Sequence, residues 1–138
     1  MDPVPEARVL AFAGLLQAAQ FVLMAVPANR ELGTATTFSP RDPGRLGRPL
    51  MEQVSPVTGR LHRAMTNHFE GLVLFTLAVV ALALTGRSNG FTLACAWTYL
   101  AARVLYVPAY ALGLVPWRSA VWLVGWAATV AMMAVAAY

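Results

Sequence analysis

The segment RLHRAMTNHFEG, residues 60–71, carries three side chains that could hold an anionic ligand inside a membrane. Arg63, Asn67 and Glu70 are separated by four and three residues, so they fall on one face of a helix. An arginine that lines a pocket without a neutralising partner favours an anionic guest. The segment therefore predicts a polar stripe with binding chemistry at the start of a membrane-spanning helix.

A second polar stripe lies further along the chain. Arg103, Tyr106 and Tyr110 are spaced by three and four residues and share a helix face in the same way. Helices joined by a short loop run antiparallel. The sum of the two residue numbers is therefore the same for every pair of residues that face each other at equal depth. The predicted pairs are Glu70 with Arg103, Asn67 with Tyr106, and Arg63 with Tyr110.

The innermost pair would lie near the middle of the membrane. A rise of about 1.5 Å per residue places Glu70 and Arg103 roughly 15 to 18 Å deep. An unpaired charge at that depth costs several kcal/mol, so we expect these two side chains to compensate each other. The pair could serve structure alone or binding, and Asn67 could serve either purpose. Arg63 and Tyr110 lie nearer the surface and keep donors for a ligand.

Other polar or reactive residues favour simpler interpretations. His62 and His68 are six residues apart and have no third ligand nearby, so we expect no metal site and place both at solvated or lipid-interface positions. Cys95 lies in an apolar run and is expected to be a small packing residue. Pro108 should kink its helix and open room beside the second polar stripe.

The composition indicates a membrane protein. Of 138 residues, 59% are hydrophobic and 12% are charged, which is too apolar for an ordinary soluble domain. All ten basic residues are arginine, and with six acids they give a formal charge of +4. This balance suits anionic lipid headgroups or a small anionic ligand. No nucleic-acid partner is expected, because no basic run is interleaved with aromatic residues.

Four apolar segments are long enough to cross a bilayer as helices, which takes about 20 residues each. Residues 27–60 separate the first two segments, and their proline, glycine, threonine and arginine content predicts a long loop outside the membrane. The predicted fold is one all-α domain over residues 1–138, a four-helix transmembrane bundle whose first helix is retained rather than cleaved as a signal. The predicted spans are 7–26, 61–85, 91–115 and 120–138.

The arginines also predict an orientation, because positive residues are retained on the cytoplasmic side. Most of them lie in the long loop and in the last connection, whereas Arg8 and Arg87 lie on the opposite side. We therefore expect the long loop in the cytoplasm and both termini on the other side. The arginines of the cytoplasmic side are Arg30, Arg41, Arg45, Arg48, Arg60 and Arg118.

Four motifs in this order, RAMTNHFEG, LFTLAVV, ARVLYVPAY and WRS, resemble the MAPEG family of membrane-associated proteins in eicosanoid and glutathione metabolism, in its bacterial branch. The specific residues lie mainly in 60–119, while the four-helix plan covers the whole chain. The resemblance implies a homotrimer in the bacterial inner membrane. It also implies glutathione as co-substrate, bound between neighbouring subunits in a site that opens to the cytoplasm.

The resemblance further implies roles for individual residues. Arg30 resembles an arginine that the adjacent subunit contributes, and Arg118 resembles the arginine that faces the glutathione sulfur. An adjacent arginine would favour the thiolate of a thiol whose pKa is otherwise about 8.5. The glutathione-binding positions carried over are Arg63, Asn67, Glu70, Arg103, Tyr106 and Tyr110.

Together these observations predict a membrane-bound transferase or peroxidase that uses glutathione, or a related thiol, on lipophilic electrophiles. Its partners would be glutathione, a lipophilic small molecule, membrane lipids and other copies of the chain. Two other functions stay open, a small proton-coupled exporter in which Glu70 is the coupling carboxylate, and a noncatalytic membrane scaffold. Trp117 and Trp122 are expected to anchor the membrane interface.

Overall fold

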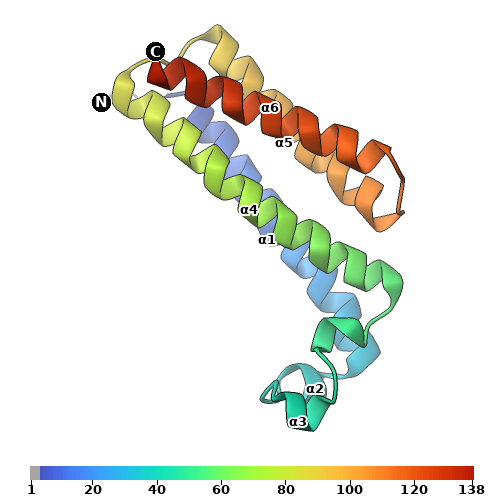
Figure 1. The fold of residues 1–138 in the computed structure, drawn as a ribbon. Coiled ribbons are helices and arrows are strands. Elements are labelled where there is room, and N and C mark those ends of the chain that lie inside the picture. The colour runs from blue at the N-terminus through green and yellow to red at the C-terminus, as the bar shows by residue number, and fades with distance from the viewer. Residues whose placement is uncertain (1–3) are drawn as a thin grey trace.

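The structure is a computed structural model and describes residues 4–138. It is all-helical, with four long helices and a segment of short helical turns between the first two (Figure 1). The long helices are α1 (Glu6–Leu32), α4 (Pro56–Thr85), α5 (Gly90–Ala111) and α6 (Trp117–Ala137). The short elements are α2 (Thr34–Thr37), α3 (Pro43–Leu46) and the single 3-10 turn η1 (Leu50–Glu52).

The four long helices are able to cross a membrane. They contain 21 to 30 residues, and the best 18-residue window of each has a mean hydropathy between 1.2 and 2.0. At about 1.5 Å per residue, the shortest of them matches the hydrocarbon core of a bilayer, about 30 Å. The chain is therefore an integral membrane protein with four spans, as its composition predicts.

The long loop is shorter than the sequence suggests, because both flanking helices run further than predicted. The first helix continues through Pro27 and ends only at Gly33, whose φ of 79° terminates it. A proline inside a membrane helix is tolerated where neighbouring groups compensate for its missing N–H. At the other side of the loop, Ser55 caps α4 by accepting a hydrogen bond from the Thr58 backbone N–H, and Pro56 occupies the first turn. The predicted loop 27–60 is wrong at both boundaries.

The connection between α5 and α6 also differs from the prediction. The helix α5 ends at Ala111, where Gly113 takes a φ of 69°. The Arg60 guanidinium from α4 donates a hydrogen bond of 3.4 Å to the Ala111 carbonyl, which satisfies one free acceptor at this helix end. The helix α6 then starts at Trp117, three residues earlier than predicted.

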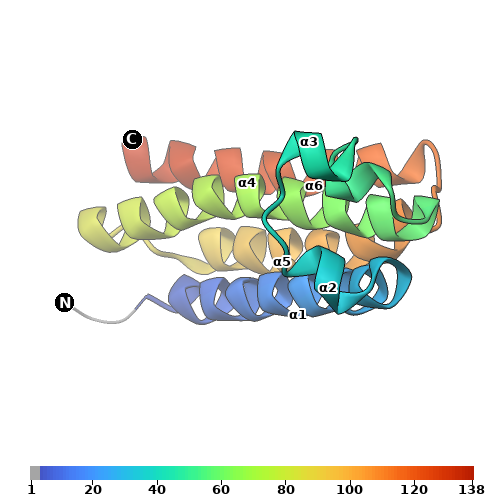
Figure 2. The same ribbon diagram turned by 90° about the horizontal axis from the view of Figure 1, so that it is seen from below.

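The long helices lie side by side in one bundle (Figure 2). Both α1 and α6 pack against α4 and α5, so the central pair separates the first helix from the last. Both chain termini and the α4–α5 connection lie at one end, here called the termini end (Figure 1). The short helices of residues 33–55 and the α5–α6 connection lie at the other end, here called the loop end.

An apolar core fills the termini end. The Phe75 ring stacks on Tyr99 with centroids 4.0 Å apart and planes at 9°. Around them pack small side chains such as Ala78 and Ala96, which let the helix backbones approach closely. Cys95 packs partly buried against this core, which agrees with the packing role expected for it.

A buried carboxylate joins three parts of the chain at the termini end. Glu6 of α1 is 0% exposed and accepts hydrogen bonds from the hydroxyls of Ser88 and Thr92. Asn89 between them forms a capping box with Thr92 at the start of α5. Burial of a carboxylate is tolerated because these hydroxyls satisfy its oxygens. The first helix is thereby tied to the α4–α5 connection.

Candidate functional site

A cleft at the loop end brings together side chains from three helices. Its volume is about 260 Å³. Four of the residues that line it belong to the predicted binding and catalytic set, and two were not predicted to be there. The lining residues are Asn67 of α4, Tyr106 and Tyr110 of α5, and Arg118, Ser119 and Trp122 of α6.

Helical spacing explains why these residues meet. Tyr106 and Tyr110 are one turn apart on α5, with ring centroids 5.4 Å apart and planes at 57°. Arg118 and Ser119 occupy the first turn of α6, and Trp122 lies one turn further along. The sequence motif around the tyrosines and the start of the next helix therefore converge on one space.

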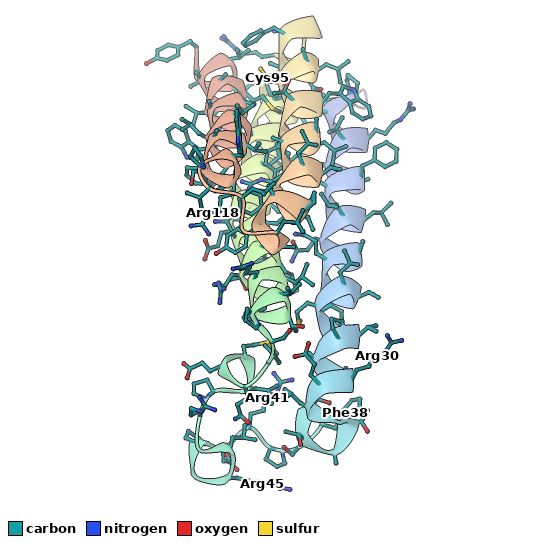
Figure 3. All side chains as sticks on the ribbon, turned by 90° about the vertical axis from the view of Figure 1, so that its right-hand side faces the viewer. Arg30, Phe38, Arg41, Arg45, Cys95 and Arg118 are labelled. Carbon is teal, nitrogen blue, oxygen red and sulfur yellow. The ribbon has the colours of Figure 1, made fainter. Side chains whose placement is uncertain are left out.

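The cleft is electropositive. The Arg118 guanidinium carbon lies 5.0 Å from the centroid of the Tyr110 ring, in a cation–π contact. No carboxylate is among the cleft-lining residues that the structure describes. The N-terminal turn of α6 adds its partial positive charge at the same place. In Figure 3, Arg118 lies toward the loop end of α6, whereas Cys95 lies toward the termini end. The cleft can hold an anionic group near Arg118.

Arg103 supports the cleft from inside the bundle. This side chain is 3% exposed, and its Nη1 donates a hydrogen bond of 3.1 Å to Asn67 Oδ1. Its guanidinium carbon lies 5.2 Å from the Tyr99 ring centroid and 5.8 Å from that of Tyr106. The aromatic faces and the amide oxygen stabilise the buried charge. Arg103 thereby holds the Asn67 side chain at the wall of the cleft.

Two glycines lie beside this arginine, and one of them makes room for it. A Cβ on Gly71 of α4 would overlap Arg103 Nη2, whereas a Cβ on Gly125 of α6 would lie at an ordinary contact distance of 3.7 Å from Arg103 Nε. The guanidinium therefore lies directly against the α4 backbone. Sequence analysis missed both glycines. Gly71 could have been predicted to face Arg103, because it directly follows Glu70, the residue expected at the same depth as Arg103.

The predicted ion pair between Glu70 and Arg103 is wrong. Within residues 4–138, Arg103 bonds to Asn67 and forms no ion pair, and Glu70 is exposed on the protomer surface. Arg103 lies beside Gly71, the neighbour of Glu70, but closeness along the helix axis does not fix the direction of a side chain. Glu70 is turned about 60° around α4 from Asn67, and the long arginine reaches the amide one turn away.

The histidine and tryptophan expectations also need correction. His68 is 1% exposed and its Nδ1 shares a hydrogen bond with Gln20 Oε1 of α1, so it lies inside the bundle rather than at a solvated or lipid-facing position. Trp122 lines the cleft, whereas Trp117 is 68% exposed, as expected of an interface anchor. One hydrogen bond joins the buried histidine to a buried glutamine on the facing helix, a contact that hydropathy cannot reveal.

Comparison with known protein families matches residues 9–138 to the MAPEG family. The chain belongs to the MAPEG family. This match covers nearly the whole chain and all four membrane helices. MAPEG proteins are in general membrane enzymes that depend on glutathione, so family membership implies glutathione binding and transferase or peroxidase chemistry in general terms. Comparisons with curated proteins and with solved structures found no match.

Three residues of the predicted MAPEG site lie outside the cleft of the single chain. Arg63 and Glu70 are exposed on α4, and the Arg63 guanidinium lies beside Gly59, one turn toward the loop end. Arg30 is exposed near the end of α1. Figure 3 shows Arg30 and Arg118 on opposite sides of the protomer. One chain therefore does not bring Arg30 to its own cleft.

Proposed function

We propose that this MAPEG protein binds glutathione, or a related thiol, in the cleft at the loop end and transfers it to, or reduces with it, a lipophilic electrophile. The observation that carries this proposal is the convergence of Arg118 with Asn67, Tyr106 and Tyr110 on one electropositive space. The tyrosine and asparagine side chains offer hydrogen bonds to a peptide, and the arginine offers a charge to an anion.

Arg118 is the residue we propose for stabilising the thiolate. A free thiol has a pKa of about 8.5 and is only slightly ionised at neutral pH. A guanidinium next to the sulfur, together with the positive end of α6, would favour the anionic form and increase the nucleophilic fraction. The thiolate would then attack the electrophilic atom, whose leaving group departs with the bonding electrons.

A homotrimer would complete the site. The cleft of one chain, about 260 Å³, is smaller than the roughly 300 Å³ at which ligand pockets usually begin. Arg63 and Glu70 lie on the exposed surface of α4, and Arg30 lies on the side of the protomer away from Arg118. We propose that subunit contacts bring Arg30 of one chain to the cleft of the next, where these three residues join the binding set.

The proposed orientation follows from the arginine distribution. The loop end carries Arg41, Arg45 and Arg48 in the segment between α2 and η1, and Arg118 at the mouth of the cleft. With positive residues on the cytoplasmic side, glutathione would enter from the cytoplasm and a lipophilic acceptor from the bilayer. The bacterial inner membrane is the location that this proposal assigns.

Thermal stability in detergent tests the proposed binding. A ligand that binds only the folded protein stabilises it by mass action, so glutathione at a hundredfold excess over its Kd should add about 2.7 kcal/mol. The variant Arg63→Ala should lose the glutathione-dependent rise in Tm. Arg87→Ala, an exposed arginine at the termini end, should keep it. An unchanged rise in Arg63→Ala would refute the polar stripe of α4 as part of the binding site.

One observation favours the proton-coupled exporter as a second candidate. Glu70 is exposed on a membrane helix and has no ion-pair partner among residues 4–138, since Arg103 bonds to Asn67 instead. Proton release on adding a lipophilic cation, abolished by Glu70→Gln, would support transport. Glutathione-dependent stabilisation without such release would support the thiol enzyme, and the absence of both responses would indicate a scaffold.

A further inference from the structure

Two adjoining cavities lie on the α1 side of α4. They measure about 550 Å³ and 510 Å³, and both are lined by Phe21 of α1 and Met65 of α4. The cleft described above uses Asn67 on another face of the same helix. The two cavities together form a groove, here called the α1–α4 groove, that is distinct from the proposed glutathione site.

The inner part of the groove is mostly apolar and open. Its lining on α1 includes Gly14, Ala18 and one polar side chain, Gln17, and on α4 it includes Thr66 and Phe69. A Cβ placed on Gly14 would meet no atom within 4 Å. Phe69 is 58% exposed, so a large hydrophobic side chain borders this space. The walls of this part suit a hydrocarbon chain rather than a polar ligand.

The outer part of the groove is covered by the long loop. Leu50, which is 7% exposed, contributes an apolar wall from the loop, and Phe38, which is 85% exposed, lies at the rim. The loop is held in place because Thr37 donates a hydrogen bond to the Asn29 side chain of α1, and Arg41 Nη2 donates one of 3.5 Å to the Thr37 carbonyl. The cover is therefore a folded part of the protein.

The loop also joins the two helices that form the groove. Glu31, in the last turn of α1, accepts hydrogen bonds from the Ser55 backbone N–H at 2.6 Å and from the Thr58 hydroxyl at 2.6 Å. These bonds connect the end of α1 to the start of α4. The two helices that line the groove are therefore tied together at the loop end.

The cationic side chain of the groove, Arg41, lies at one end. Arg41 lines the outer part together with the imidazole of His62, and no acidic residue of the described chain lines either part. A ligand with an anionic group and an apolar chain would complement both ends. Basic pockets between membrane helices at the bilayer surface recognise lipid headgroups in this way.

The length of the groove matches one leaflet of a bilayer. Its lining residues on α1 run from Gly14 to Asn29, which corresponds to about 23 Å of helix. Half of a hydrocarbon core is about 15 Å, and the remainder reaches the headgroup layer. An acyl chain that starts at the loop end would extend to the middle of the membrane.

We propose that the α1–α4 groove binds an anionic phospholipid from the leaflet next to the long loop. The headgroup phosphate lies by Arg41 and His62, and one acyl chain runs past Phe21 and Met65 toward Gly14. This site goes beyond the proposed thiol chemistry and does not depend on it.

Native mass spectrometry of the delipidated protein tests the headgroup site. We expect phosphatidylglycerol to be retained about fivefold better than phosphatidylcholine with the same acyl chains, since one arginine near a lipid surface contributes a factor of about five. Arg41→Gln should remove the preference. Arg45→Gln, in the same loop but away from the groove lining, should retain it. Equal retention of the two lipids by the unmodified protein, or an unchanged preference in Arg41→Gln, would overturn the proposal.

A second variant tests the chain site. Gly14→Leu fills open space in a helix, so it should leave the fold intact while displacing the acyl chain. Its retention of both lipids should fall, and a photoreactive acyl chain should label Phe21, Met65 or Phe69 in the unmodified protein but not in the variant. Photolabelling confined to α6 would contradict a bilayer lipid in the groove. So would displacement of the photoreactive lipid by free oleate but not by phosphatidylglycerol. A crosslink that places a second copy of the chain in the groove would also contradict it.

The glutathione response separates the two proposals. Arg41→Gln should keep the glutathione-dependent rise in Tm, because Arg41 does not line the cleft of Arg118. If the unmodified protein shows the glutathione-dependent rise in Tm but no preference for phosphatidylglycerol, that result would refute the lipid site and leave the glutathione site standing.

Discussion

The termini end and the loop end of this bundle are built from the same four helices but packed in different ways. At the termini end, alanines such as Ala78 and Ala96 surround the stacked rings of Phe75 and Tyr99, and no cleft with polar walls forms among the residues of the described core. At the loop end, two tyrosines of α5 and Arg118 and Trp122 of α6 line a cleft together with Asn67 of α4. Small side chains thus accompany the closed end, and large polar and aromatic side chains line the open one.

The two ends also differ in how completely their buried polar side chains are hydrogen-bonded. Glu6 is fully buried and accepts hydrogen bonds from two hydroxyls, so its position is fixed. Arg103 is equally buried, but it has one acceptor, Asn67, and its Nε has no hydrogen-bond partner within residues 4–138. The carboxylate at the termini end is therefore fully hydrogen-bonded, whereas Arg103, next to the cleft wall, keeps one N–H donor unused among the described residues.

Phe75→Ala should produce the largest change and should affect stability alone. Removing a fully buried aromatic ring creates a cavity and costs about 3 kcal/mol or more in the free energy of unfolding. Denaturant titration in detergent measures this loss, and the Kd of glutathione should stay within about twofold. Phe91→Ala, at an exposed position, is the control. A large loss of glutathione affinity with intact stability would break the separation between the two ends.

Arg118→Ala should affect chemistry and spare both stability and binding. Without the guanidinium, we expect turnover with a chloroaromatic acceptor to fall about a hundredfold while the KM for glutathione changes little. Because Arg118 is proposed to stabilise the thiolate, its removal should also change how the rate depends on pH. The unmodified protein should keep its rate at lower pH, and the variant should lose it as the pH falls below about 8.5. Identical pH profiles would argue against a thiolate role for Arg118.

Gly71→Ala should disturb the loop end from inside. The new methyl group would displace the Arg103 guanidinium and weaken its hydrogen bond to Asn67, so we expect glutathione affinity to fall about tenfold. Gly14→Ala, also in a membrane helix but facing open space, should bind glutathione normally. Isothermal titration compares the two variants. Normal affinity in Gly71→Ala would show that Arg103 does not position the cleft wall.

Thr92→Val should give the smallest of these effects, confined to the termini end. The change removes the hydrogen bond to the buried Glu6 and the capping bond from the Asn89 backbone N–H, and should cost about 1 kcal/mol of stability without altering glutathione affinity. Thr98→Val removes only a bond from an exposed hydroxyl to its own helix and serves as the control. Equal stability of the two variants would mean that Glu6 does not anchor the first helix.

The sequence predicts the four spans and much of the cleft because both depend on local patterns. Hydropathy and length identify membrane helices directly, and spacings of three and four place Tyr106 and Tyr110 on one face. Asn67 and Arg118 also line the cleft, as part of the predicted binding and catalytic set. Assembly into a trimer and the roles of these residues stay predictions.

The features that sequence analysis missed depend on the direction and reach of side chains across helices. Arg103 bonds to Asn67 rather than Glu70 because Gly71 leaves room for the guanidinium, and this cannot be read from spacing alone. His68 finds Gln20 on α1, which is far away in sequence. Helix α1 continues through Pro27 because a membrane helix tolerates a missing N–H. Each outcome is decided by tertiary contacts rather than by periodicity.

A cryo-electron microscopy map of the lipid-embedded assembly with glutathione tests the central claim most directly. Our account predicts density for glutathione in the cleft between α4, α5 and α6, with its sulfur within hydrogen-bond reach of Arg118, about 3.5 Å. Density for glutathione elsewhere, with the side chains of Asn67, Tyr110 and Arg118 free of ligand, would contradict it.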